Sequence, residues 1–413
     1  MVSRNRIAIQ KIQQDDVKSA VFSALKRIGA EELMVKEGMT VLLKPNLLSG
    51  KKPEAAVTTH PKVMQAVIQW VKQFNPAKIY VCDSSGGGIK TGTTDRAMVG
   101  SGIKDICEEE GENVICVPFE ATEREIYIVQ NPLELEEFPS SRLLKDADLI
   151  INLPKIKTHG QCVLTCCIKN MFGTILRTNK AKTHARFPSL DRFTSALADI
   201  YSVSNPQLTV IDGYFAMEGN GPGSGEPVKL DLILAGYDGV ALDTTVCNIT
   251  EIPVKDVRYL AFAEQKGLGT TDLSKIEFQG ESIENVKRKF KLPTSISPTS
   301  AWLPKKVANY ISDTVFKAKI GFDSNRCILC GTCWENCPVG AIKPPEIKKK
   351  GNTPVWDKNI CITCFCCHEL CPEAAVTLKV PIARNAIFSW LGLLFLGFLT
   401  IVGTTIGLLV SLL

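Results

Sequence analysis

Two cysteine runs constrain the fold of this chain more than any other feature of its sequence. From Cys327 the chain reads CILCGTCWENCP, and from Cys361 it reads CITCFCCHELCP. Both runs fit the pattern C-x2-C-x2-C-x3-C-P, and four thiolates are the ligands of a [4Fe–4S] cluster. Zinc sites with four cysteines also use CxxC spacing, but two complete copies with a trailing proline favour iron–sulfur clusters over zinc.

Residues 321–380 resemble the bacterial two-cluster ferredoxins, which are small α+β domains. In those domains the fourth cysteine of each run ligates the other cluster, so the resemblance implies two [4Fe–4S] clusters with crossed ligands. The first cluster would be held by Cys327, Cys330, Cys333 and Cys371, and the second by Cys361, Cys364, Cys367 and Cys337. Cys366 lies inside the second run at a spacing that does not fit, so we expect it to be a non-ligand. Two adjacent clusters imply one-electron transfer.

The other cysteines and the overall composition favour a globular protein in a reducing environment. Sixteen cysteines would suggest disulfides in a secreted protein, but half of them fall in the two runs and the N-terminus lacks the apolar region of a secretory signal. An apolar fraction of 45% and a net charge of +5 exclude a disordered chain. We expect the main body to lie in the cytoplasm.

The C-terminal stretch has a different character. No charged residue occurs from Ala386 to Leu413, and this length exceeds the roughly 20 apolar residues that cross a bilayer. Lys379 and Arg384 precede the stretch and no charge follows it, which favours a cytoplasmic position for the preceding domain. The sequence therefore predicts one transmembrane helix over 386–412 and a single-pass location in the cell membrane.

Residues 1–282 alternate short apolar runs with helical patterns. This alternation predicts an α/β body with a mostly parallel sheet that is covered on both faces. Polar residues repeatedly follow the apolar runs, at Lys44-Pro-Asn46, Asp83, Lys155, Asp212 and Asp238. Open α/β sheets bind ligands beyond the carboxyl ends of their strands, so a shared cleft explains this pattern better than five separate helix caps.

Residues 283–320 form a basic connection between the body and the cysteine runs. Apolar residues recur in it at helical spacing, which predicts a linker with an amphipathic helix. Such a helix could lie on anionic lipid or pack on either neighbouring domain. No nucleic-acid-binding motif accompanies the charge, so we expect no nucleic-acid partner.

The stretch from Pro154 to Gly173 concentrates the polar residues of the body. In an extended segment Lys155, Lys157 and His159 point to one side, and Lys169 follows at the start of a helix. Ammonium groups and an imidazole at a helix N-terminus suit a carboxylate or a phosphate. The cysteines of this stretch could bind a third metal or pack as small apolar side chains, and we favour packing; they are Cys162, Cys166 and Cys167.

Two glycine-rich loops invite a phosphate-binding interpretation, at 84–92 and 218–225. The first lacks the glycine that precedes the lysine of a P-loop, and neither fits the dinucleotide pattern. The second would let backbone approach a ligand or would form a mobile turn.

With these motifs, the body resembles the family catalogued as domain of unknown function 362, which is often fused to ferredoxin modules. The matching pieces are Lys44-Pro-Asn46, Asp83-Ser84, Pro154 to His159, Thr165, Lys169-Asn170, Phe172-Gly173, His184, Asp212-Gly213, Gly219 to Pro222, Asp238 and Ala241 to Asp243. The cysteine triplet departs from the family pattern, in which small or apolar residues stand there. The resemblance implies a fold and a ferredoxin partner domain, but no settled reaction.

These features lead to a principal hypothesis of a membrane-anchored electron-transfer protein whose two clusters exchange electrons with a redox partner protein or a small anionic ligand at the body. As an oxidoreductase it would reduce that ligand. The expected catalytic residues are His159, His184 and Lys157, and the expected substrate-binding residues are Lys44, Asn46, Asp83, Lys155, Lys169, Asn170, Asp212 and Asp243. The alternatives are a non-enzymatic relay subunit that docks a larger membrane redox complex, and an assembly factor that hands clusters on.

Overall fold

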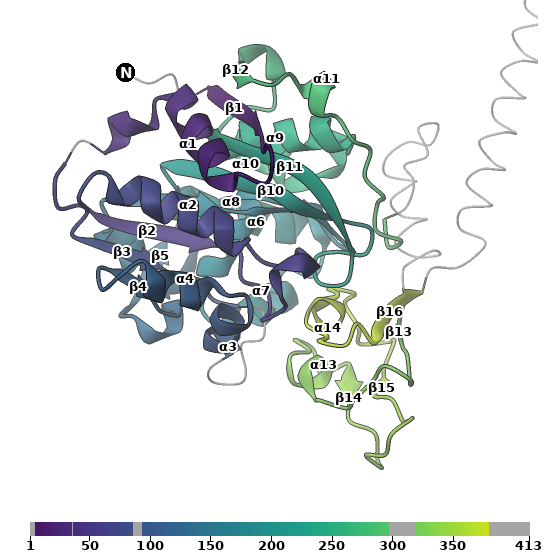
Figure 1. Ribbon diagram of the computed structural model, residues 1–413. Coiled ribbons are helices and arrows are strands. Elements are labelled where there is room, and N and C mark those ends of the chain that lie inside the picture. Colours follow the sequence, from purple (N-terminus) through teal and green to yellow (C-terminus); the bar gives the residue numbers. More distant parts are fainter. Residues whose placement is uncertain (1–4, 35, 86–92, 297–318, 380–413) are drawn as a thin grey trace, which may run out of the picture.

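The computed structural model describes residues 5–34, 36–85, 93–296 and 319–379. An α/β body comes first in the chain, and a smaller cysteine-rich domain lies beside it (Figure 1). We call residues 319–379 the ferredoxin domain.

A ten-stranded sheet forms the centre of the body. Its main path runs in the order β12-β1-β11-β10-β7-β2-β3-β4, and β8 pairs with β10 and with β9. The strands of this sheet are β1 (Arg6–Lys11), β2 (Thr40–Pro45), β3 (Lys78–Val81), β4 (Val114–Cys116), β7 (Leu149–Leu153), β8 (Lys155–His159), β9 (Val163–Thr165), β10 (Leu208–Glu218), β11 (Glu226–Gly236) and β12 (Glu277–Gly280). A separate hairpin pairs β5 (Arg124–Ile128) with β6 (Glu137–Ser141).

Helices cover both faces of this sheet. They are α1 (Val17–Ile28), α2 (Pro61–Lys72), α3 (Thr93–Gly100), α4 (Ile103–Glu109), α5 (Leu143–Asp146), α6 (Cys167–Asn170), α7 (Asn179–Arg186), α8 (Leu190–Ser204), α9 (Gly239–Thr250), α10 (Arg258–Gln265) and α11 (Ile283–Val286). In β1, Ala8 packs with α1 and α2, whereas Ile7 and Ile9 pack with α8, α9 and α10. This division follows because successive side chains of a strand point to opposite faces.

The predicted mostly parallel sheet is corrected to a mixed one. β11 runs antiparallel to both of its neighbours, β1 and β10. Only residues 219–225 separate β10 from β11, and a parallel pair needs a crossover of a dozen or more residues. The pairs β2–β3, β3–β4, β2–β7 and β7–β10 are parallel, so their carboxyl ends meet at one edge. Lys44, Asp83 and Lys155 lie at or just after the ends of β2, β3 and β7, and Asp212 lies within β10. Asp238 departs from the expected cleft, because it follows the antiparallel β11 and caps α9.

The ferredoxin domain contains two short helices and two small antiparallel sheets. β13 (Lys319–Phe322) pairs with β16 (Val376–Lys379), and β14 (Ile342–Lys343) pairs with β15 (Val355–Trp356). The helices α13 (Thr332–Glu335) and α14 (Cys366–Glu369) each begin inside one cysteine run. Figure 1 shows α14 on the side that faces the body, and β14 and β15 on the side that faces away.

The predicted transmembrane helix is not supported. No helix in the described part of the chain is long and apolar enough to cross a membrane, and the segment 386–412 itself lies outside the described residues. The fold class is therefore corrected to a mixed α/β body with a small cysteine-rich α+β domain. The single-pass membrane location and the membrane contact, which depended on that helix, are withdrawn. Of the linker 283–320, residues 297–318 also lie outside the described residues.

Candidate functional site

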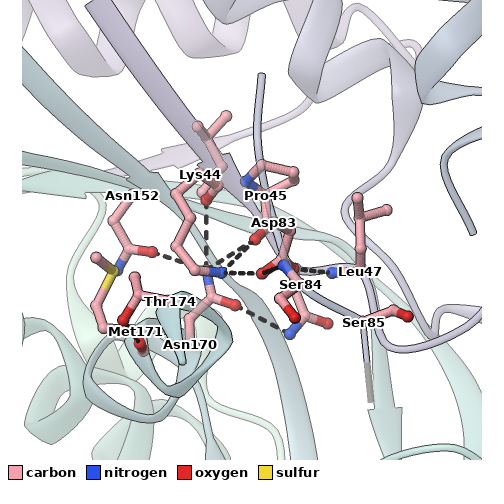
Figure 2. Close-up of polar contacts among 12 residues, drawn as sticks. Lys44, Pro45, Leu47, Asp83, Ser84, Ser85, Asn152, Asn170, Met171 and Thr174 are labelled. Carbon is pink, nitrogen blue, oxygen red and sulfur yellow. Dashed lines mark hydrogen bonds and ion pairs between the residues drawn. The ribbon is translucent and has the colours of Figure 1, made fainter. Parts of the chain in front are cut away.

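Lys44 and Asp83 form a buried ion pair at the carboxyl ends of β2 and β3 (Figure 2). Lys44 Nζ lies 2.8 Å from Asp83 Oδ1, and Asp83 Oδ2 accepts a hydrogen bond from the backbone N–H of Leu47 at 2.7 Å. A Cβ at Gly173 would collide with both members of the pair, which explains the glycine at this position. The pair therefore fixes the backbone at Leu47, just after β2.

A second buried pair joins β8 to β10. Lys155 Nζ lies 2.8 Å from Asp212 Oδ2, and both side chains are fully buried. The same oxygen accepts a hydrogen bond from the backbone N–H of His60 at 2.6 Å. Lys44, Lys155 and Asp212 are thus held by partners of their own chain, and among the described residues none of the three lines the cavity described below.

Lys157 has a different environment from these paired lysines. Its Nζ donates to the Asn46 Oδ1 and to the backbone oxygen of Val57, both at 2.7 Å. Burial, together with the positive charges of Lys169 and Lys155, lowers the pKa of Lys157 to about 7. Its amino group therefore changes its charge near neutral pH, where the charged form can bind an anion or give up a proton.

An amide chain orients the acceptor of Lys157. Asn46 Nδ2 donates to Asn170 Oδ1 at 3.0 Å, and Asn170 Nδ2 donates to Asn152 Oδ1 at 2.7 Å. Figure 2 shows Asn170 and Asn152 beside the Lys44 pair. Because each amide nitrogen has an acceptor, the oxygen of Asn46 is turned toward Lys157.

His159 connects the body to the ferredoxin domain. Its Nδ1 accepts hydrogen bonds from the backbone N–H groups of Gln161 and Cys162, so the neutral ring carries its proton on Nε2. That Nε2 lies 3.0 Å from Glu369 Oε1, at an orientation that falls short of a hydrogen bond. Burial and the charge of Lys169 lower the pKa of His159 to about 4. Burial opposes the ionisation of Glu369, but His159 and Lys169 lower the pKa of its carboxyl below the usual range.

His184 is a second buried imidazole in this region. Its ring stacks on Phe193 at 4.1 Å between centroids and meets Phe172 edge-on at 5.7 Å. Burial lowers the pKa of His184 to about 3, so the ring is neutral. Its Nδ1 is buried and has no hydrogen-bond partner among the described residues. An unpartnered buried nitrogen is costly unless a water molecule or a ligand completes it.

These groups line a cavity of about 230 Å³ between the two domains, which we call the composite cavity. The body contributes Lys157, Lys169, His159 and His184 to its wall, and the ferredoxin domain contributes Cys337, Cys366 and Glu369. The other predicted site residues in its lining are Asn46, Asp83 and Asn170, and sequence reasoning missed Arg177, Lys180 and Glu369. Asp83 is offset by Lys44, so the body side of the cavity is cationic.

The glycine-rich loop 219–225 holds the ferredoxin domain in place. The ring of His368 lies with Nε2 3.2 Å from the backbone oxygen of Asn220 and Nδ1 2.6 Å from that of Val376. A Cβ at Gly223 would overlap the backbone oxygen of Glu369, so only glycine allows α14 to approach this closely. The loop therefore contacts a protein domain, and this contact accounts for Gly223, whereas Gly221 and Gly225 are crowded by Thr158 and Glu218 of the body.

Asp243 lies away from the composite cavity, beside Cys166 and Cys167. One ligand atom from each of the three buried residues lies within 4.8 Å of the others, which is a spacing that a metal ion could use. Both carboxylate oxygens of Asp243 already accept backbone hydrogen bonds, from Cys167 at 2.7 Å and Ile168 at 3.1 Å. Burial raises the pKa of Cys166 to about 11, which keeps the thiol protonated. These contacts favour a packing role, with Asp243 fixing the start of α6.

The cysteine runs form two further cavities. The first is lined by Cys327, Cys330, Cys333 and Cys371, and the second by Cys337, Cys361, Cys364 and Cys367. Each group of four therefore fits the donor set of a [4Fe–4S] cluster. Cys366 is absent from the lining of the second cavity and instead lines the composite cavity.

Comparison with known proteins identifies both domains. The family model described as a domain of unknown function (DUF362) matches residues 41–248, and the model described as a 4Fe-4S binding domain matches residues 320–343. A thylakoid-associated protein of Synechocystis sp. is 30% identical over 300 residues, which are 72% of this chain and 89% of that protein.

Two solved structures resemble the fold distantly. The lactate racemase apoprotein from Thermoanaerobacterium thermosaccharolyticum is 16% identical with a TM-score of 0.41, over 61% of this chain and 58% of that one. A protein from Thermotoga maritima is 13% identical with a TM-score of 0.35, over 62% and 60%. The chain spans less than two thirds of either structure, and likenesses this distant say nothing about activity.

The fold and the cysteine runs define an α/β protein fused to a 4Fe-4S binding domain, which has an electron-transfer role. The chain belongs to the family described as domain of unknown function (DUF362), as the sequence motifs predicted.

Proposed function

We propose that the ferredoxin domain holds two [4Fe–4S] clusters and exchanges electrons with an anionic small molecule bound in the composite cavity. The observation that carries this proposal is that one cavity is lined both by the cationic residues of the body and by residues of the cysteine runs. When bound, the clusters supply or accept single electrons. With electrons flowing inward, the protein is a reductase of that molecule.

The second cysteine cavity lies next to the composite cavity. Cys337 and Pro338 line both of them. A ligand in the composite cavity would therefore lie against Cys337, which is one of the second group of four cysteines. The two groups of four cysteines support a count of two clusters.

The residues of the body have separate roles in this proposal. Lys157 and Lys169 bind the negative charge of the ligand, because no carboxylate of the described residues forms an ion pair with either ammonium group. His184 offers its unpartnered Nδ1 to the ligand. Lys157 can also supply a proton at neutral pH, since its pKa is about 7. His159, whose charge is suppressed by burial, places its Nε2 3.0 Å from Glu369 Oε1 at the cavity wall.

The test is native mass spectrometry of the full chain, purified without oxygen, together with iron analysis. We expect about eight irons per chain and a bound organic anion. Lys157→Ala should lose the anion while the iron content and the visible absorbance stay unchanged. Lys62→Ala, which alters an exposed lysine of α2, should keep both. About eight irons with an empty composite cavity in the unaltered protein would contradict the proposal and favour a non-enzymatic relay.

A further inference from the structure

The two cysteine cavities lie at different depths in the molecule. The second shares Cys337 and Pro338 with the composite cavity, whereas the first shares no lining residue with it among the described residues. The first cavity faces solvent, because its Cys330 is exposed and its Ile328 has 63% of its surface exposed. Electrons from outside therefore reach the first cavity more directly than the second.

A basic hairpin lies against both cysteine cavities: Ile342 of β14 lines the second cavity, and the lysine-rich turn that follows β14 reaches the wall of the first. From Lys343, the last residue of β14, to Lys350 the hairpin contains four lysines and one acidic residue, and all four lysines are exposed. Lys348 Nζ lies 6.0 Å from the ring centroid of Trp334, and Trp334 lines the first cavity. The positive charge is thus placed next to the exposed cysteine loop, on the side of the domain that faces away from the body (Figure 1).

The hairpin also exposes apolar side chains. Ile347 has 68% of its surface exposed and Val355 has 57%, both on the same hairpin as the lysines. Within the described part of the chain, none of the four lysines takes part in an ion pair. Unneutralised charge next to exposed apolar surface is the composition of a protein-docking site, where charge steers the encounter and apolar contact holds the complex.

We propose that the hairpin 343–355 and Ile328, together the hairpin face, dock a small acidic one-electron carrier protein. In each encounter the carrier loses one electron and the group held by the first four cysteines gains it. This inference depends on one part of the proposed function, namely that the cysteines hold iron–sulfur clusters. It does not depend on a ligand in the composite cavity. An anionic lipid surface would also attract lysines. Binding to lipid, however, does not explain why these lysines lie beside an exposed cysteine loop.

The experiment measures the affinity of the anaerobically purified full chain for a small acidic [2Fe–2S] ferredoxin, by calorimetry at several salt concentrations. We expect binding that weakens steeply with salt, because the Debye length is about 10 Å at 0.1 M. The variant with Lys348→Glu, Lys349→Glu and Lys350→Glu should bind about tenfold more weakly, with a shallower salt dependence. The control with Lys18→Glu, Lys26→Glu and Lys255→Glu, all exposed on the body, should bind as the unaltered chain does.

The outcomes separate this inference from the proposed function. Iron content and visible absorbance report the clusters, and the carrier affinity is measured without any ligand in the composite cavity. Equal carrier affinity for the hairpin variant and the unaltered chain would overturn the docking site even if the clusters are intact. Binding to vesicles of phosphatidylcholine and phosphatidylserine that the hairpin variant loses, with no affinity for the acidic carrier, would assign the surface to lipid instead.

Discussion

The lysines that follow the strands of the body divide into two groups. Lys44 and Lys155 each meet a buried carboxylate at 2.8 Å, whereas Lys157 and Lys169 face the composite cavity. Lys155 and Lys157 are only two residues apart on one strand and are both fully buried. Burial therefore does not separate Lys155 from Lys157, whereas the carboxylate partner does. The paired lysines stabilise the fold, and the other two are available to a ligand.

The largest expected effect comes from breaking a pair. Lys155→Met leaves Asp212 buried without its counter-ion, and removing one partner of a buried pair costs about 3–5 kcal/mol. Urea unfolding followed by circular dichroism measures this loss. The control is Lys229→Met, which breaks a surface pair with Asp15 and should cost less than about 1 kcal/mol. Similar urea midpoints for the two variants would mean that the buried Lys155–Asp212 pair stabilises the fold no more than a surface pair does.

Overpacking the first pair should have the next largest effect. Gly173→Ala places a methyl group against Lys44 and Asp83, and we expect a loss of about 1–3 kcal/mol because neither partner can move without breaking the pair. The same urea titration detects it. An unchanged midpoint would mean that the Lys44 pair is less constrained than the distances indicate.

The third prediction concerns the pH dependence of anion binding by Lys157. The pKa of Lys157 is about 7, so its ammonium is charged below this pH and neutral above it. Affinity for an anionic probe such as oxalate should therefore fall as pH rises above 7, by up to about tenfold per unit. The charges of Lys169 and Lys155 lower the pKa of Lys157 further, and those of Glu369 and Asp83 raise it.

The control for this pH dependence is Lys157→Arg, because a guanidinium stays charged throughout the range. If Lys157 is the titrating group, the affinity of this variant for oxalate should not fall as pH rises through 7. A separate fall near pH 8 would report Lys180, which also lines the cavity and whose pKa burial lowers to about 8. A fall in affinity that persists in this variant would assign the titration to another residue.

The smallest expected effect is on stability, from Lys157→Met. Removing this ammonium leaves two acceptors without their donor, but it also removes the cost of burying a charge that has no carboxylate partner. The two terms offset, so the free energy of unfolding should change by less than about 1 kcal/mol. A loss as large as that of Lys155→Met would show that Lys157 is also a structural lysine.

The sequence predicted the edge of the sheet where the polar residues gather, because the carboxyl ends of parallel strands meet there. It could not predict which lysines are paired. Asp83 lies 39 residues from Lys44, and Asp212 lies 57 residues from Lys155, so the pairing depends on the order of the strands. The antiparallel β11 was missed although the glycine-rich turn between two apolar runs is a hairpin signal.

Glu369 was missed for a different reason. It lies between two cysteines of the second run, where the spacing pattern allows any residue, and nothing in the sequence of the body indicates that His159 faces it. A charged residue in that spacer is a weak signal of a contact outside the ferredoxin domain. Only the relative position of the two domains reveals the contact.

The position of Glu369 limits which ferredoxin domains this body can accept. A different two-cluster domain could supply the same eight cysteines. Unless it also carried an acidic residue between the last two cysteines of its second run, His159 would have no carboxylate opposite it. The loop 219–225 adds a second requirement. The backbone of residue 369 must fit against Gly223, where even a Cβ atom would leave no room for it. Exchange of this module between chains is therefore restricted by the three residues between Cys367 and Cys371, a segment that the cluster-binding pattern leaves free to vary.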